Sequence, residues 1–523
     1  MICKLINHLK LIIDTVKFLK TKQILYQILY RLKKFQYSDN YIPNKVQLSW
    51  NEILKNNDTY TGNKSFNFIN IKHHFKNDID WNEKSNDKLW LYHLNYFEYL
   101  NQKNMTKEEG LFLIEDYINN YPSIKDGKEP YPSSLRIINY IKFISKNDVK
   151  DLNILKVIKE DANRLSVNLE YHLLGNHILE NGFALWFAAN LFNDKRLYKI
   201  SNKIFITELD EQILSDGAHF ELSPMYHIII LYRVLDCINL DIENPNKENK
   251  ILIQKLRVLA PKMLSWLHNM TFKNGSFPLF NDSANGVVPT PAEIFQYASL
   301  LGIKKSTSSL DDSGYRDFRN DNYELIADVG EIKASYQPAH AHADTFSFVL
   351  NVEGVPIIVD RGISTYNISK NRLNERSTKA HNTITINDKN SSDVWSSFRV
   401  GKRAKTKIKY DSDNILSATH NGYKNLKSIH YRKWTFEKSK IIIDDKLGND
   451  IEAKAYLHFH PKSSVSIKNK IIFINENIEI SFKNLMDIRL LDYSFNSEFN
   501  NPIKSMKAEI SFKKDLLTSI KIK

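Results

Sequence analysis

The sequence predicts an α+β multidomain protein in which a helical first part is followed by antiparallel strands. Up to about residue 303, apolar residues recur at three- and four-residue spacing, which is the period of a helix. Residues 304–322 are polar and have no period, as in a linker. Beyond them the period is two, which is typical of strands. The chain has 523 residues, more than one compact core usually needs, so two large domains are expected.

Residues 1–40 predict an amphipathic helical segment. Charged residues interrupt each of its apolar runs, whereas a signal peptide needs an uninterrupted apolar core and a membrane span needs about 20 apolar residues. We therefore expect neither a signal peptide nor a membrane span. The protein is expected to be cytoplasmic or associated with the inner membrane. Two interpretations stay open: the helix packs on the protein, or it rests as a basic helix on an anionic membrane.

The next segment, residues 41–303, predicts a long run of paired helices. Stretches rich in Gly, Pro, Asn, Asp and Ser separate them, such as YPSIKDGKEPYPSS and FKNGSFPLFNDSANGVVPTP. Residues 323–523 predict many short strands. A hairpin is expected around the Glu353-Gly354 turn, and stretches such as NTITIND and KIIFINENIEISF continue the pattern, which favours an antiparallel sandwich.

The charge balance favours a polyanionic partner. Lys and Arg number 73 against 60 acidic residues, so the formal net charge is +13. An acidic glycan fits this excess, and no zinc-finger, RNP or helix-turn-helix signature supports nucleic acid. The only cysteines, Cys3 and Cys237, predict neither a disulfide framework nor a cysteine metal site.

Two helical segments carry dense polar groups. In GNHILENG, the side chains of Asn176, His177, Glu180 and Asn181 share part of one helix face, where they form either a buried network or a site. About 40 residues later, ELSPMYH places Tyr226 in an early turn after a Ser223-Pro224 helix start. A phenol there can project into a cleft, although a core tyrosine is the commoner case.

A third group lies in QPAHAHADTFSF. If this segment is a strand, His340, His342 and Asp344 project from one face. Histidines of this segment, together with Asp360 and His381, could supply the three His and carboxylate ligands that suit zinc. A two-residue hairpin turn would put Asp360 on the face away from His342, and a different loop length or a bulge would reverse that.

Taken together, GNHILENG, ELSPMYH, HAHAD, IVDRG and RSTKAHNT resemble the heparinase II/III-like family of polysaccharide lyases, over nearly the whole chain. The resemblance implies an incomplete α/α toroid followed by an antiparallel β-sandwich. The early stretches WLYHLNYFEYL and EPYPSSLRIINYIK resemble members associated with bacterial surface polysaccharides, which suggests a role in capsule or O-antigen metabolism.

The resemblance also implies roles for individual residues. It suggests that Asn176, His177, Tyr226 and His340 are catalytic, that Glu180, Glu221 and Arg376 bind substrate, and that His342, Asp360 and His381 hold one structural zinc ion. One departure is the Pro338-Ala339 pair, where many relatives have glycine before the first histidine.

These residue types suit β-elimination from a uronate. Donors such as Asn176 and His177 would neutralise the sugar carboxylate, and either Tyr226 or His340 would take the adjacent proton. Two rivals remain: a glycoside hydrolase on a helical toroid that uses Glu180 and Glu221, and a noncatalytic protein that binds acidic glycans. The sequence does not predict the oligomeric state.

Overall fold

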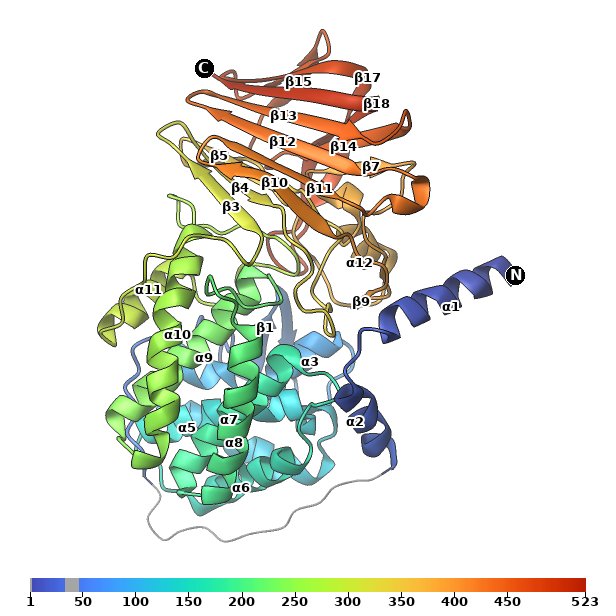
Figure 1. Ribbon diagram of the computed structural model, residues 1–523. Coiled ribbons are helices and arrows are strands. Elements are labelled where there is room, and N and C mark those ends of the chain that lie inside the picture. Colours follow the sequence, from blue (N-terminus) through green and yellow to red (C-terminus); the bar gives the residue numbers. More distant parts are fainter. Residues whose placement is uncertain (1, 33–46) are drawn as a thin grey trace.

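The computed structural model describes residues 2–32 and 47–523, and it has a helical part and a strand part stacked on each other (Figure 1). Residues 33–46, where the first predicted boundary falls, lie outside the described residues. The α-helices of the helical part are α1 (Ile2–Val16), α2 (Thr21–Leu32), α3 (Lys88–Tyr96), α4 (Lys107–Asn120), α5 (Pro130–Lys146), α6 (Leu152–Val167), α7 (Gly175–Phe192), α8 (Lys195–Gln212), α9 (Pro224–Glu243), α10 (Lys250–Asn269) and α11 (Pro291–Leu300).

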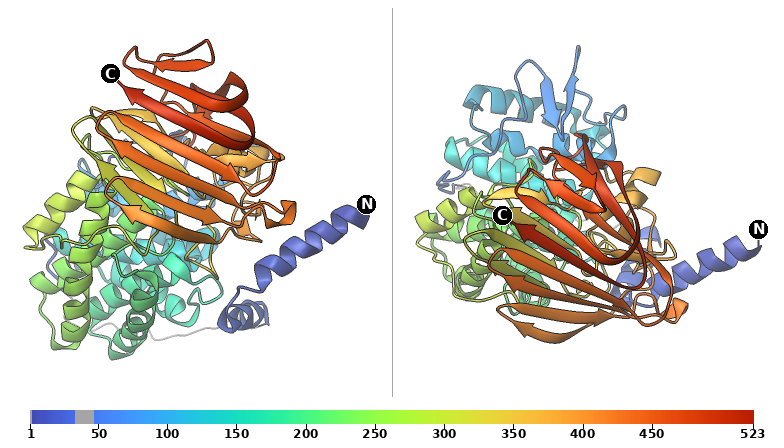
Figure 2. Two further views of the ribbon diagram at one scale, coloured as in Figure 1. Left: turned by 45° about the horizontal axis from the view of Figure 1, so that its top comes forward. Right: turned by 90° about the horizontal axis from the view of Figure 1, so that it is seen from above.

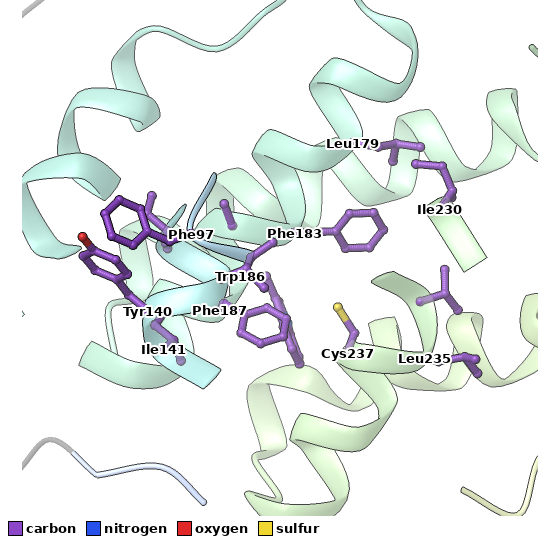
Figure 3. Packing of buried hydrophobic residues seen from close by; sticks show 14 of the residues in the cluster. Phe97, Tyr140, Ile141, Leu179, Phe183, Trp186, Phe187, Ile230, Leu235 and Cys237 are labelled. Carbon is purple, nitrogen blue, oxygen red and sulfur yellow. The ribbon is translucent and has the colours of Figure 1, made fainter. Parts of the chain in front are cut away.

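Helix α7 runs through the middle of the helical core. It packs against α5, α8 and α9, and nearly all of its residues are buried, which explains why its sequence is apolar on most faces. Figure 3 shows Phe183 and Trp186 of this helix beside Tyr140 from α5 and Cys237 from α9. The polar first turn of α7 is therefore held by a rigid apolar body.

The strand part contains two larger antiparallel sheets. One has four strands in the order β3-β4-β5-β6, and the other has ten, with β14 and β7 beside the path β10-β11-β12-β13-β18-β17-β16-β15. The bounds are β3 (Tyr315–Arg319), β4 (Tyr323–Asp328), β5 (Phe348–Val352), β6 (Val355–Ile358), β7 (Ile384–Ile386), β8 (Val394–Trp395), β9 (Arg399–Val400), β10 (Thr406–Ser412), β11 (Ile415–His420), β12 (His430–Glu437), β13 (Lys440–Leu447), β14 (Glu452–His458), β15 (Val465–Lys468), β16 (Ile471–Ile474), β17 (Ile478–Phe495) and β18 (Ile503–Ile522).

A second apolar core joins these two sheets. Leu325 and Leu350 of the small sheet share it with Trp434 and Ile510 of the large one. Figure 2 shows the long strands β17 and β18 curving over the helical part. Residues near the end of β17, including Phe495, pack into the helical core, so the two parts meet through an apolar contact.

The predicted hairpin is present and carries a bulge. Its turn residues Glu353 and Gly354 both have positive φ, and Val352 pairs with Val355. The register then shifts, because Leu350 pairs with Ile358. This bulge shifts the register by one residue, and Asp360 lies two residues beyond the end of β6.

Several local predictions differ from the structure. A hairpin of β1 (Ser65–Phe68) and β2 (Ile71–His74) interrupts the helical part; its strands are too short to show a period. The predicted linker 304–322 contains β3, which pairs with β4. Helix α12 (Lys370–Glu375) interrupts the strand part.

The segment around His340 is not the strand that its alternation suggested. It forms turns, because its backbone groups pair with distant partners: the amide of His342 donates to Asn281 Oδ1 and that of Ala343 donates to the carbonyl of Arg376. A loop pinned in this way can aim His340 and His342 separately.

Candidate active site

A cleft of about 720 Å³ lies between the helical part and the strand part. Both parts contribute to its walls, and Asn176, His177, Tyr226 and His340 all lie on it. The structure therefore brings the four predicted catalytic residues together. Aromatic side chains make up much of the remaining wall: Phe68, Tyr92, Tyr96, Tyr131, Tyr232, Tyr366, Phe398 and Phe499.

The first turn of α7 places Asn176 by means of Gly175. This glycine has a φ of +60°, and a Cβ there would lie 2.7 Å from Glu221 Oε1. The close approach lets the backbone amide of Asn176 donate to Glu221 Oε1 at 3.0 Å, and its side-chain Nδ2 donates to both carboxylate oxygens. Glu221 is therefore tied to the first turn of α7.

Glu170 favours the charged form of His177. Its Nδ1 lies 3.0 Å from Glu170 Oε1, and the other oxygen of that carboxylate accepts from Asn181 Nδ2. Burial would lower the pKa of His177, but the Glu170 carboxylate raises it above its ordinary value. The ring packs on Tyr131, 4.6 Å between centroids. A histidine whose charged form is favoured thus lies on the helical wall of the cleft.

Tyr226 lies in the first turn of α9 and stacks on His340. Pro224 opens the helix, which confirms the predicted Ser223-Pro224 start, and Ser223 caps it by accepting from the Tyr226 amide. The rings of Tyr226 and His340 lie 3.8 Å apart, and the Tyr226 hydroxyl is 3.1 Å from that of Tyr366. Burial raises the pKa of Tyr226, which keeps it a neutral phenol.

Asp282 organises the wall opposite α7, and the sequence analysis missed it. Its carboxylate is 2.9 Å from His340 Nδ1, 2.8 Å from His342 Nε2, and 2.5 Å from the Arg372 guanidinium, which binds both oxygens. Burial would raise the pKa of Asp282, but Arg372 and the two histidines hold it well below its usual range. The other ring nitrogen of His340, Nε2, lies 3.6 Å from Glu221 Oε2.

The three predicted zinc ligands lie near one another. His381 Nδ1 is 2.7 Å from Asp360 Oδ2, and the His342 and His381 rings are 5.2 Å apart. Among the described residues, no three His, Cys, Asp or Glu side chains converge closely enough to hold a metal ion. Within that same part of the chain, His342 Nδ1 and His381 Nε2 are buried and have no hydrogen-bond partner. Two such imidazole nitrogens are donors that suit zinc. The zinc ion stays a prediction.

The predicted substrate-binding residues lie behind the walls of the cleft. Glu180 is buried and accepts from Arg233 Nε at 3.1 Å. Arg376 is buried and donates to the carbonyls of Ala341 and Ser397; burial lowers its pKa to about 9. With Glu221 bound to Asn176, the structure does not bring any of these three side chains to the cleft surface, and their role in binding stays a prediction.

The chain belongs to the heparinase II/III-like family. The family description Heparinase II/III N-terminus matches residues 133–300, and Heparinase II/III-like, C-terminal matches residues 302–514. These ranges contain every predicted site residue.

Curated relatives agree with this family. A heparin-sulfate lyase of Pedobacter heparinus is 26% identical over 341 residues, which is 59% of this chain and 49% of the relative. A heparin-sulfate lyase of Bacteroides stercoris is 25% identical over 332 residues, 57% of this chain and 47% of the relative. The match thus spans about half the length of these relatives.

Solved structures share the fold. A crystal structure of heparinase III superposes with a TM-score of 0.70 and 17% identity, covering 96% of this chain and 89% of that one. The structure of a heparan sulfate lyase mutant from Pedobacter heparinus gives a TM-score of 0.59 at 17% identity, covering 88% and 81%. These likenesses describe the fold alone.

Proposed function

We propose that the protein is a polysaccharide lyase that cleaves a uronate-containing acidic polysaccharide by β-elimination in this cleft. The observation that carries the proposal is the stack of Tyr226 on His340, on the same cleft as Asn176 and His177. An acid and a base in contact, on the same cleft as two donors, match what elimination needs.

In the proposed reaction, His177 binds the sugar carboxylate. Its positive charge stabilises the anion that develops when the adjacent carbon loses its proton. We propose that His340 takes that proton on Nε2, while its Nδ1 donates to Asp282. The electron pair forms the new double bond, and the bond to the glycosidic oxygen breaks. Tyr226 protonates this leaving oxygen, a role that its raised pKa favours.

Asn176 would act beside His177. Its Nδ2 is engaged by Glu221, while its Oδ1 is buried without a hydrogen-bond partner among the described residues. We propose that substrate binding rearranges this pair, so that the Asn176 amide turns to the uronate carboxylate.

Zinc, when bound, would be structural. We propose His342, Asp360 and His381 as its ligands. Held at His342, the loop would keep His340 two residues away in its place. Metal content and melting temperature are measured for the unaltered protein and for His342→Ala. The variant should lose both the zinc and heat stability.

The positions of Glu180 and Glu221, the pair considered for a hydrolase, favour elimination over hydrolysis. A glycoside hydrolase needs two carboxyl groups that flank the scissile bond. Glu180 is covered by Arg233, and Glu221 is engaged by Asn176. Neither side chain lines the cleft.

We further propose a bacterial surface polysaccharide, in capsule or O-antigen metabolism, as the substrate. The two stretches that suggested this lie on the cleft: Tyr92 and Tyr96 come from WLYHLNYFEYL, and Tyr131 from EPYPSSLRIINYIK. Sugar rings pack on such aromatic faces. We also propose that the helices form the incomplete α/α toroid, and the two larger sheets the β-sandwich, of this family.

A panel of uronate polysaccharides tests the activity. Elimination leaves an unsaturated uronate that absorbs in the ultraviolet, so absorbance should rise with one or more acidic glycans and not with neutral ones. New reducing ends without absorbance would identify a hydrolase. Binding without any product across the panel would identify a noncatalytic glycan-binding protein.

A further inference from the structure

Helix α1 is fastened to the strand part by one side only. Thr15 is buried there, accepts from Trp395 Nε1 at 3.1 Å and contacts the carbonyl of Val400. His8 lies edge-on to the Trp395 ring. Figures 1 and 2 show the rest of this helix extending away from the body of the protein.

The opposite side of α1 is an exposed apolar stripe. Its members recur at helical spacing and stay largely open to solvent: Ile6 57%, Leu9 50%, Ile12 36%, Ile13 65% and Val16 44%. Helix α2 adds Ile24, Leu25, Ile28 and Leu32, each at least 40% exposed. Apolar side chains gathered in this way indicate a surface that is covered in use.

Basic residues accompany the stripe. Residues 1–34 contain eight Lys or Arg and a single acidic residue, Asp14, in a chain whose net charge is +13. Lys10 on α1 and Lys17, the residue directly after its end, are exposed and lie along one edge of the stripe, four residues after Ile6 and Ile13; Lys17 also pairs with Asp14. An apolar stripe with a basic edge is the composition of helices that lie in the interface of an anionic bilayer.

We propose that α1, together with α2, docks the protein peripherally on an anionic membrane, with the stripe in the headgroup region. A second copy of the chain fits less well. A two-fold pairing of the stripes would bring Lys10 and Lys17 toward the same lysines of the other copy, whereas anionic lipid would neutralise them. Among the described residues, no helix has the length and hydropathy of a membrane span, so the contact is peripheral.

The contact would place one wall of the cleft near the bilayer. Trp395, which holds α1, is followed directly by Ser396, Ser397, Phe398 and Arg399, which line the cleft. A glycan presented at the membrane surface would therefore meet the cleft next to its anchor.

The experiment is co-sedimentation of the full chain with vesicles. Phosphatidylglycerol mixed with phosphatidylcholine should bind it at low salt, and phosphatidylcholine alone should bind it at least tenfold more weakly. Leu9→Glu with Ile13→Glu should reduce binding by about tenfold or more, since the two side chains could no longer enter the apolar layer. Lys10→Glu with Lys17→Glu should abolish the preference for anionic lipid.

A matched pair on α10 is the control. Ile251 and Val258 are 80% and 62% exposed on a helix distant in sequence, so Ile251→Glu with Val258→Glu should bind vesicles as the unaltered protein does. Circular dichroism should be the same for all variants. Binding is measured without substrate, so its outcome is independent of the proposed lyase activity.

Two results would overturn the proposal. One is equal binding by the α1 variant and the α10 control. The other is a dimer in sedimentation velocity, without lipid, that the α1 variant converts to a monomer, because this would assign the stripe to a second copy.

Discussion

The two walls of the cleft position their polar residues in different ways. On the helical wall, Asn176, His177 and Tyr226 lie in the first turns of α7 and α9; Ser223 caps α9, and a buried core holds both helices. On the other wall, His340 lies in a loop, where Asp282 and the Arg372 guanidinium hold it. The comparison teaches that local helix geometry builds one wall, and a long-range buried ion pair builds the other.

The largest expected effect is on the helical wall. Tyr226→Phe removes the proposed acid but leaves its ring stacked on His340, so turnover should fall by about a hundred- to ten-thousand-fold. The free energy of unfolding should change by about 1 kcal/mol or less, since only one hydroxyl contact is lost. Initial rates and urea unfolding measure the two. Turnover near that of the unaltered enzyme would rule out the acid role.

The opposite wall should respond in both activity and stability. Asp282→Asn leaves the buried Arg372 cation unpaired, which costs about 3–5 kcal/mol of unfolding free energy. His340 would also lose the partner that sets its tautomer, so turnover should fall as well. Urea unfolding of both Asp282→Asn and Tyr226→Phe compares the stability that the two walls provide. An unchanged unfolding midpoint would show that the ion pair does not hold this wall.

This difference also decides what the sequence could predict. The α9 start at Ser223-Pro224 and the period change to strands are local signals, and the structure has both. Asp282 gave no local signal: it lies in a Gly- and Asn-rich segment, and its partners His340 and Arg372 are 58 and 90 residues away. The loop form of the segment with His340 was missed for the same reason.

A pH profile examines the charge of His177. Its raised pKa means that the cationic form persists below that pKa, and turnover should fall as pH rises through it. Glu170→Gln removes the carboxylate that raises this pKa, so the fall should begin at lower pH. Glu293→Gln, which alters another cleft carboxylate, is the control and should leave the alkaline limb in place. Identical limbs for both variants would contradict the role of Glu170.

The smallest effect is expected where the walls touch. Tyr366→Phe removes the hydroxyl next to that of Tyr226 and leaves the aromatic wall intact. Losing one hydrogen bond is worth about 1 kcal/mol, so turnover should change by about fivefold. Steady-state kinetics on a responsive glycan measures it. A loss as large as that of Tyr226→Phe would move the proton-donating role to Tyr366.

The most direct test of the central claim follows oxygen from the solvent. A polysaccharide that the protein cleaves is incubated with it in water labelled with heavy oxygen, and the masses of the products are measured by mass spectrometry. Elimination at Tyr226 and His340 predicts fragments without solvent oxygen, one of which lacks the elements of water at its nonreducing end. Fragments that carry one heavy oxygen for each bond cleaved would show hydrolysis and contradict the account.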